Sequence, residues 1–300
     1  MNVTFRQLRL FLALADTGSV SAAARAMHVT QPTASMQLRE VSESVGLPLY
    51  EVIARKVYLT EAGRQLAHTA RAIVDEWERF GQTVNAMQGL THGRLRVAVV
   101  STAKYFVPRL LGGFCEQHPG IDISLEVLNR DGVVQRLREN RDDLYVMSMP
   151  PQDVDLDDQI FLANPLVMIA PADHPLASRQ RLPLKALAGE RLILRERGSG
   201  TRLATDRFLA TQGFEPQSWL ELGSNEAIKE AVAGNLGVAV ISRHAIKAED
   251  LGRDLCLLPI SGLPIRSQWH VVHPRAKQLS PIAQVFRQHL LDQARAWPQA

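Results

Sequence analysis

The stretch from Val20 to Arg39, VSAAARAMHVTQPTASMQLR, decides the fold of the first part of the chain. The alanines in its first half favour a helix and let a second helix cross it closely. The second helix is expected to begin near Gln31, because Thr30 can cap it and Pro32 is tolerated in a first helical turn. Two short helices joined by a tight turn indicate a helix-turn-helix, and an alanine-rich hairpin in a protein core is the alternative.

The polar side chains of the expected second helix are of the kind that contact DNA. Its first two turns present hydroxyl and amide groups that can reach base edges in a major groove, and Arg39 is placed to contact a phosphate. The stretch contains two arginines and no acidic residue, so its surface would not repel phosphate. From this unit we predict DNA contacts by Ser21, Gln31, Pro32, Thr33, Ser35, Gln37 and Arg39.

A helix and a hairpin are expected on either side of this unit. Apolar residues at spacings of three and four predict an amphipathic helix over Thr4–Thr17 that covers the two-helix unit. After Pro48, the weak alternation of Leu49–Leu59 predicts a short hairpin, or wing, with Arg55 and Lys56 at its basic tip. We predict that this tip contacts phosphate or a minor groove, and a solvated turn is the alternative.

A long helix with an apolar seam is expected from Thr60, which can cap it, to about Gly89. Its apolar residues recur at alternating steps of three and four, which is the period of a coiled coil. At about 1.5 Å per residue it would be about 43 Å long, too long to be hidden in a small domain. We expect the seam to bind a second copy of the chain, with packing inside its own chain as the alternative. The predicted dimer seam consists of Leu66, Ala70, Ile73, Trp77, Phe80, Val84 and Met87.

From residue 93 onward the pattern changes to alternating strands and helices, after a break at residues 90–92 that looks like a hinge. Strands are expected at residues 95–100, 121–128, 144–149, 166–171, 192–194, 238–241, 255–258 and 269–273. Helices are expected at residues 105–117, 132–139, 201–212, 226–233 and 281–296. This order predicts an α/β domain with ligand sites at the C-terminal ends of its strands.

Length and composition are those of an ordinary globular protein of two or three domains. The chain has 300 residues, 46% of them hydrophobic, a net charge of +3 and two cysteines. The charge permits nucleic-acid binding but is too small to indicate it, and the cysteines have no metal-ligand spacing. Since we find no apolar run of about 18 residues and no signal-peptide pattern, we expect a soluble cytoplasmic protein without a membrane partner.

The sequence lacks the common motifs of enzymes and metal sites. It contains no G-x-S-x-G, no phosphate-loop lysine motif and no G-x-G-x-x-G after a strand. His270 and His273 lie three residues apart on an expected strand and would point to opposite faces, which argues against a metal site. We therefore expect neither an enzyme nor a metal or cofactor.

Over essentially its whole length the chain resembles the LysR-type transcriptional regulators. The resemblance lies in AAARAMHVTQPTAS from Ala22, in LTEAG from Leu59 and in the α/β remainder. It implies a winged helix-turn-helix at residues 1–59, a dimerising linker helix at 60–89, a hinge at 90–92 and an effector domain at 93–300. The effector domain would have the type-2 periplasmic-binding-protein fold, with subdomains at 93–163 plus 267–300 and at 164–266.

Shorter motifs resemble the branch of this family that regulates carbon-dioxide fixation and bicarbonate uptake. Examples are STAKYF from Ser101 and GSNEAIK from Gly223. Regulators of sulfur assimilation share part of the pattern, especially GSGTR from Gly198, so a regulator of sulfur or other metabolism with a different anionic effector is the alternative. The wing departs from the family, with LYEV at Leu49–Val52 where Leu-Phe and then an arginine are common, and Met36 departs from it on the recognition helix.

The expected helix starts and the resemblance together predict a site for a small anionic effector, such as a phosphorylated sugar or acid. Ser101 and Thr102 lie between a strand and a helix whose free amides can bind an anion. Gly198–Arg202 combines close backbone approach with hydrogen-bond donors and a cation. Helix capping is the commoner role of any one such side chain, so the prediction depends on their convergence. The predicted effector-binding residues are Ser101, Thr102, Lys104, Ser148, Arg195, Gly200, Thr201, Arg202, Ser224, Asn225 and Gln268.

The resulting prediction is a DNA-binding transcriptional regulator whose promoter binding is modulated by a small anionic metabolite. Its expected partners are double-stranded promoter DNA, a small-molecule co-inducer and further copies of the chain, as a dimer through the linker helix and then as a tetramer. The resemblance leaves room for contact with RNA polymerase. A solute-binding protein or an enzyme on the same two-subdomain fold is the alternative of a different class, and the first would carry a signal peptide in place of the N-terminal unit.

Overall fold

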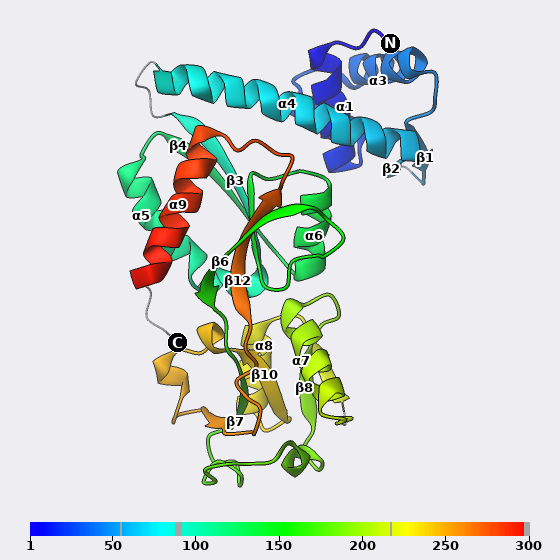
Figure 1. Cartoon of the computed structure of the whole chain (residues 1–300). Coiled ribbons are helices and arrows are strands. Elements are labelled where there is room, and N and C mark those ends of the chain that lie inside the picture. The colour runs from blue at the N-terminus through cyan, green and yellow to red at the C-terminus, as the bar shows by residue number, and fades with distance from the viewer. Residues whose placement is uncertain (55, 88–91, 217, 297–300) are drawn as a thin grey trace. The chain divides into compact units, whose positions relative to one another are not determined.

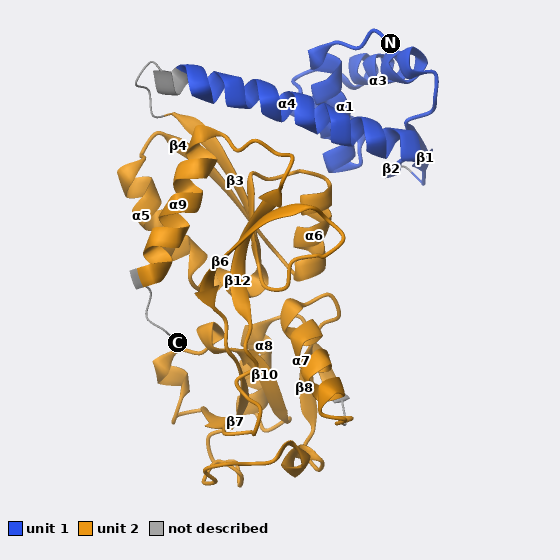
Figure 2. Cartoon of the chain, in the orientation of Figure 1, with its two compact units in different colours: residues 1–88 blue, residues 89–300 orange. Residues whose placement is uncertain are grey.

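The computed structural model describes residues 1–54, 56–87, 92–216 and 218–296. By its internal contacts the chain divides into two compact units, residues 1–88 and 89–300, which are blue and orange in Figure 2. Each unit has a hydrophobic core of its own. In the described part of the chain, no helix is both long and apolar enough to cross a membrane.

The described part of the N-terminal unit contains four helices and a hairpin. Their bounds are α1 Phe5–Thr17, α2 Val20–Ala26, α3 Gln31–Val45, β1 Tyr50–Ile53, β2 Lys56–Leu59 and α4 Glu61–Met87 (Figure 1). Hydroxyl groups cap the two helices of the helix-turn-helix. Ser19 accepts a hydrogen bond from the Ala22 amide, and Thr30 accepts one from the Thr33 amide. The predicted winged helix-turn-helix is confirmed.

Small side chains bring the first three helices close together. Ala23 and Ala24 of α2 and Ala34 of α3 are almost fully buried. They leave space for Phe11 of α1 and Leu38 of α3, which are also fully buried. Because interiors are packed as densely as organic crystals, alanines at these positions set how closely the helices approach.

The first half of α4 belongs to the core of the N-terminal unit. Leu66 and Ala70, two residues of the predicted seam, contact that core. At Gly63 an added Cβ atom would lie 1.9 Å from the carbonyl oxygen of Leu49. The same carbonyl accepts a hydrogen bond of 3.1 Å from the Thr60 amide. Glycine therefore lets α4 lie directly against the chain that leads into the wing.

The second half of α4 presents the remainder of the predicted seam. Ile73, Trp77 and Phe80 are 44%, 63% and 59% exposed within the structure. The rings of Trp77 and Phe80 lie next to each other, with centroids 5.9 Å apart. Val84 is half-buried, and the side chain of Met87 lies outside the described residues. Three large apolar side chains thus form an exposed row on one helix.

The described part of the second unit contains two five-stranded sheets, of order β4-β3-β5-β12-β6 and β11-β7-β10-β8-β9. The strands are β3 Gly93–Val100, β4 Ile121–Leu128, β5 Leu144–Met147, β6 Leu156–Ala163, β7 Leu166–Pro171, β8 Leu192–Arg195, β9 Ser218–Leu222, β10 Val238–Ser242, β11 Leu255–Leu258 and β12 Gln268–Pro274. The α-helices are α5 Val107–Gln117, α6 Arg130–Arg138, α7 Gly200–Thr211, α8 Asn225–Ala233 and α9 Pro281–Ala296. Short 3-10 helices lie at η1 Ser101–Tyr105, η2 Leu184–Leu187, η3 Arg243–Ala245 and η4 Ala248–Asp250. Two α/β subdomains were predicted, and the two sheets confirm them.

Two extended segments connect the subdomains of the second unit. The Asn164 amide donates to the Ser267 carbonyl at 2.9 Å, and the Leu166 amide donates to the Ile265 carbonyl at 3.0 Å. These bonds hold the two crossing segments together, while each sheet keeps its own core. A pair of narrow crossings between two separate cores is a layout that allows the subdomains to move about a hinge.

β6 and β9 are strands where the sequence analysis expected none. Each lies at the edge of its sheet, with β6 paired to β12 and β9 paired to β8. Edge strands tolerate polar residues, and Asp157–Gln159 interrupts the apolar pattern of β6. The strand expected at residues 144–149 ends early, at Met147, and Met149 has a positive φ of 60°.

Replacing Gly63 with alanine is expected to lower the free energy of unfolding of the N-terminal unit. The added Cβ would collide with the Leu49 carbonyl at 1.9 Å, so α4 would have to shift, at a cost of about 1–3 kcal/mol. Gly81→Ala is the matched control in the same helix, because nothing lies within 4 Å of its Cβ position. Urea unfolding followed by circular dichroism measures both variants. Equal stabilities would contradict the close approach at Gly63.

Candidate functional site: a DNA-contacting face and a cleft between subdomains

The exposed face of α3 carries several of the residues predicted to contact DNA. Gln31 and Ser35 are exposed, and the Ser21 hydroxyl donates a hydrogen bond of 3.0 Å to the Gln31 side-chain oxygen. The side chain of Arg39 is 81% exposed and pairs with Glu43 one turn later at 2.9 Å. A surface ion pair of this kind is weak, so the guanidinium remains available to a phosphate.

Other residues of α3 differ in how far they reach into solvent. Pro32 is exposed at the start of the helix, whereas Thr33 and Gln37 are half-buried at the border of the exposed face. Met36 is 56% exposed in the middle of that face, and the sequence analysis had noted it only as a departure from the family. An apolar side chain in this position can contact the methyl group of a thymine.

The wing presents a mixed surface. Lys56 is exposed at the start of β2, and Arg55 lies outside the described residues. Val52 and Ile53 of β1 are largely exposed as well. Glu51 of β1 is exposed too, so the described part of the wing offers one cation and one carboxylate together with apolar side chains.

In the second unit, a buried arginine bonds the two subdomains to each other. Arg195, at the end of β8, is 2% exposed, and its guanidinium donates to Ser101 Oγ at 3.1 Å and to Asn225 Oδ1 at 2.9 Å. The Asn225 side-chain Nδ2 donates in turn to Thr102 Oγ1 at 3.3 Å. Ser101 and Thr102 follow β3 in the first subdomain, while Arg195 and Asn225 belong to the second. The structure brings these four predicted effector-binding residues together.

The charge of Arg195 is neutralised inside the same cluster. The Glu196 carboxylate accepts two hydrogen bonds from its guanidinium, at 2.7 Å and 3.0 Å. A buried charge is costly unless it is paired and hydrogen-bonded, which explains the arrangement. Any anion that binds to Arg195 must therefore compete with Glu196.

A second ion pair crosses the same boundary. Lys104 Nζ donates to one Glu226 oxygen at 2.9 Å, and the Tyr105 hydroxyl donates to the other at 2.7 Å. Burial acts to raise the pKa of Glu226, but the hydrogen bonds from Tyr105 and Lys104 outweigh it and lower that pKa to about 2. Burial and the neighbouring carboxylate raise the pKa of the Tyr105 hydroxyl. Near neutral pH, Glu226 is therefore ionised and Tyr105 is protonated.

The glycine-rich turn before α7 lies against the first subdomain. An added Cβ atom at Gly200 would lie 2.9 Å from Ser148 Oγ, and one at Gly198 would lie 2.6 Å from a carboxylate oxygen of Asp131. Gly198 also has a φ of 85°, which favours glycine. Ser148 and Thr201 are both buried. The predicted residues Ser148, Gly200 and Thr201 thus line a second close contact between the subdomains.

Arg130 belongs to this region, although the sequence analysis did not select it. Its Nε donates to the Met149 carbonyl at 2.7 Å, and its Cδ lies 3.7 Å from the position that a Cβ would take at Gly200. The sequence pattern predicts a helix from Gly132 and therefore a loop at Arg130, whereas α6 begins at Arg130 itself. The signal was Asn129, whose side chain accepts a hydrogen bond from the Gly132 amide and caps α6 directly after β4.

In the described part of the chain, three predicted effector-binding residues make no side-chain hydrogen bond or ion pair across the subdomain boundary, although Arg202 donates a hydrogen bond of 3.0 Å to the Arg195 carbonyl within the second subdomain. Arg202 pairs with Asp206 and Glu221 at 2.9 Å and 3.0 Å, so its charge is used within its own subdomain. The Ser224 hydroxyl caps α8 by accepting an amide hydrogen bond of 3.0 Å. Gln268 is exposed and lines a separate cavity beside α7.

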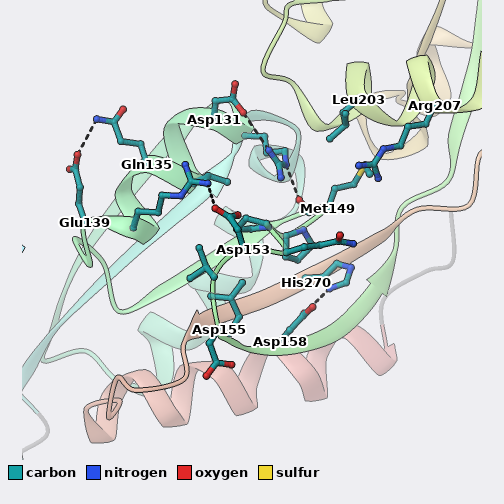
Figure 3. A pocket seen from close by; sticks show the side chains of 18 residues that line it. Asp131, Gln135, Glu139, Met149, Asp153, Asp155, Asp158, Leu203, Arg207 and His270 are labelled. Atoms are coloured by element: carbon teal, nitrogen blue, oxygen red, sulfur yellow. Dashed lines mark hydrogen bonds and ion pairs between the residues drawn. The ribbon is translucent and has the colours of Figure 1, made fainter. Parts of the chain in front are cut away.

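A large cavity of about 1210 Å³ lies between α6, the segment after β5 and α7 (Figure 3). Its charges are largely paired, with Arg138 bound to Asp153 at 2.8 Å and His270 bound to Asp158 at 2.7 Å. Among the described residues that line it, acidic side chains outnumber arginines. This cavity is therefore poorly suited to a small anion. No group of three or more potential metal ligands occurs in the described parts of the chain.

Two protein families match the chain. Residues 5–64 match the bacterial regulatory helix-turn-helix protein, lysR family, and residues 88–295 match the LysR substrate binding domain. The HTH-type transcriptional activator CmpR of Synechocystis sp. is 42% identical over 289 residues, which cover 96% of this chain and 95% of CmpR. The RuBisCO operon transcriptional regulator of Allochromatium vinosum is 42% identical over 294 residues, which cover 98% of this chain and 97% of that protein.

A solved structure is similar to the second unit. The CcmR regulatory domain of Synechocystis, in complex with 2-PG, is 47% identical in sequence and superposes with a TM-score of 0.66. The match covers 68% of this chain and 98% of that domain. Since both family matches and full-length relatives agree with the fold, the chain belongs to the LysR family of bacterial transcriptional regulators.

Proposed function

We propose that this LysR-family regulator controls genes for carbon-dioxide fixation or bicarbonate uptake, and that its effector is 2-phosphoglycolate or a closely related phosphorylated acid. The observation that carries the proposal is the 47% identity to the CcmR regulatory domain, which was solved with 2-PG. The curated relatives CmpR and the RuBisCO operon regulator favour the same branch. Regulation of sulfur or other metabolism is the alternative. The protein would act in the cytoplasm, where its DNA lies.

The exposed face of α3 supports sequence-specific binding in a major groove. Gln31 and Ser35 would contact base edges, and Arg39 would contact a phosphate. The bond from Ser21 to Gln31 orients the amide before DNA arrives. Lys56 on the wing would add a second backbone contact.

The cluster between the subdomains supports an anionic effector. Arg195 and Lys104 supply two cations, and each is paired with a carboxylate of the same chain, Glu196 or Glu226. We infer that the phosphate and carboxylate of the effector take over part of these bonds. A phosphate accepts more charge-assisted hydrogen bonds than a carboxylate does, so it can compete for the arginine and for nearby hydroxyl groups. Glu226 then acts as an internal substitute for the effector.

Effector binding would change how the subdomains close. The bonds of Arg195 and Glu226 cross the boundary, so replacing them alters the free-energy difference between the open and closed arrangements. A ligand shifts that equilibrium only if it binds one arrangement better. In the oligomer, a change in closure would alter which DNA half-sites are held and how far the DNA bends.

Self-association would use the exposed row on α4. Ile73, Trp77 and Phe80 repeat on one side of the helix and expose a large apolar area. Burying it against the same row of a second copy would remove it from water. We propose a dimer through this row, with a tetramer formed by further contacts.

Two substitutions on α3 are expected to affect DNA binding differently. Gln31→Ala should weaken binding to the promoter by about 1–3 kcal/mol and leave binding to random duplex nearly unchanged, because it removes a base contact. Arg39→Ala should weaken binding to both duplexes and reduce the salt dependence by about one phosphate contact. Titrations with both duplexes over a salt series measure these effects, with Arg253→Ala in the second unit as the control. Equal losses on both duplexes for both variants would contradict the assigned roles.

The effector and the target genes are tested together. We expect genome-wide mapping of bound DNA to find sites upstream of carboxylase or bicarbonate-transport genes. We also expect 2-phosphoglycolate, added to the full-length protein at such a site, to change the DNase I footprint, while sulfate at equal concentration does not. Sites beside sulfur genes, or a footprint that ignores 2-phosphoglycolate, would overturn the proposal and leave the family assignment intact.

A further inference from the structure

A second cavity of about 810 Å³ lies beside α7 and the segments that connect the subdomains. The apolar residues that line it include Phe208, Ile265 and Pro165. The polar residues that line it include Arg207, Arg266 and Gln268. A volume of several hundred Å³ with an apolar wall and a few convergent polar groups is typical of small-molecule sites.

Two arginines, Arg207 and Arg266, supply the positive charge that lines this cavity. In the described part of the chain, neither Arg207 nor Arg266 has a hydrogen bond or an ion pair through its guanidinium. By contrast, Arg195, Arg202 and Arg138 are each paired with a carboxylate. None of the described residues that line the cavity is acidic. Two cations with no internal partner therefore converge on one apolar hollow.

The position of Arg207 suits a ligand in this hollow. Figure 3 shows Arg207 extending from α7 toward Met149, and both residues line the cavity beside α7 as well as the larger one. His270 also lines both cavities. Its Nδ1 forms a hydrogen bond of 2.7 Å with the Asp158 carboxylate, which leaves Nε2 as the ring nitrogen that could contact a ligand. An anion here would therefore meet the guanidinium groups without first displacing a carboxylate, unlike an anion at Arg195.

We propose that this cavity is a second effector site, which binds an organic anion with an apolar or aromatic body. The anionic group would accept charge-assisted hydrogen bonds from Arg207 and Arg266. The apolar body would lie against Phe208 and Ile265. The site shares no residue with the cluster around Arg195, so it goes beyond the effector of the proposed function.

The cavity is lined by residues of both subdomains, so ligand binding there can affect how the subdomains are arranged. Ile265 and Gln268 bracket the segment that crosses between the subdomains, while Arg207 belongs to the second subdomain and Met149 to the first. A ligand held between them contacts both sides of the hinge. It therefore favours whichever arrangement brings these walls together.

The test uses the full-length protein and 1-anilinonaphthalene-8-sulfonate, an aromatic sulfonate whose fluorescence rises in apolar sites. We expect saturable binding at one site per chain. The double variant Arg207→Gln, Arg266→Gln should weaken it by at least about tenfold, since two charge-assisted hydrogen bonds are lost. The double variant Arg179→Gln, Arg253→Gln carries the same change in charge at exposed positions outside the cavity and should bind as the wild type does.

Two further measurements identify the interaction. N-phenyl-1-naphthylamine, the uncharged analogue of the probe, should bind the wild type and the Arg207, Arg266 variant alike, because it has no anion to lose. Isothermal titration with 2-phosphoglycolate should give the same affinity for the wild type and that variant, which separates this site from the proposed function. Equal affinity of the sulfonate for both double variants would overturn the second site. So would an apparent dissociation constant of the sulfonate that rises without limit as 2-phosphoglycolate is added, because coupling through the hinge saturates whereas competition for one site does not.

Discussion

The arrangement of the second unit depends on the buried Arg195 guanidinium, whose hydrogen bonds reach across the subdomain boundary. A fully buried charge must be compensated where it lies, and here Ser101, Asn225 and Glu196 do so from both subdomains. Moving the subdomains apart would strip the guanidinium of one partner, so closure and charge compensation are coupled. The boundary between the subdomains is thus bridged by groups that are able to bind an anion.

The N-terminal unit depends on a steric constraint of a different kind. Small residues set how closely its helices approach each other and the wing. Alanines lie between α2 and α3, and Gly63 of α4 lies against the Leu49 carbonyl. This close packing holds the first half of α4 in the core of the unit, while the exposed row of Ile73, Trp77 and Phe80 lies on its second half. The same helix can therefore be part of one core and still offer a surface to a second chain.

Local patterns predicted most of the fold, because caps and periodicity act over a few residues. Thr30 and Asn129 show the strength and the limit of such signals: the first marked α3, and the second was overlooked, which left Arg130 out of the site. The partners of the predicted cations could not be predicted, since Glu226 meets Lys104 across 122 residues of sequence. For the same reason the pairing of Arg202 with Glu221 could not be predicted. The strands β6 and β9 were not predicted from the sequence. Each lies at the edge of its sheet, where polar residues are tolerated and the apolar pattern of a strand is weak.

Under the proposed function, Glu226 holds Lys104, one of the two cations that the effector needs. The most direct test is the affinity of the full-length protein for 2-phosphoglycolate, measured by isothermal titration at low salt, for the wild type and for Glu226→Gln. We expect the variant to bind at least about threefold more tightly, because Lys104 loses its anionic partner and a carboxylate that would repel the effector is removed. Glu249→Gln, at an exposed pair with Lys247, should leave the affinity unchanged. Equal or weaker binding by Glu226→Gln would contradict the claim.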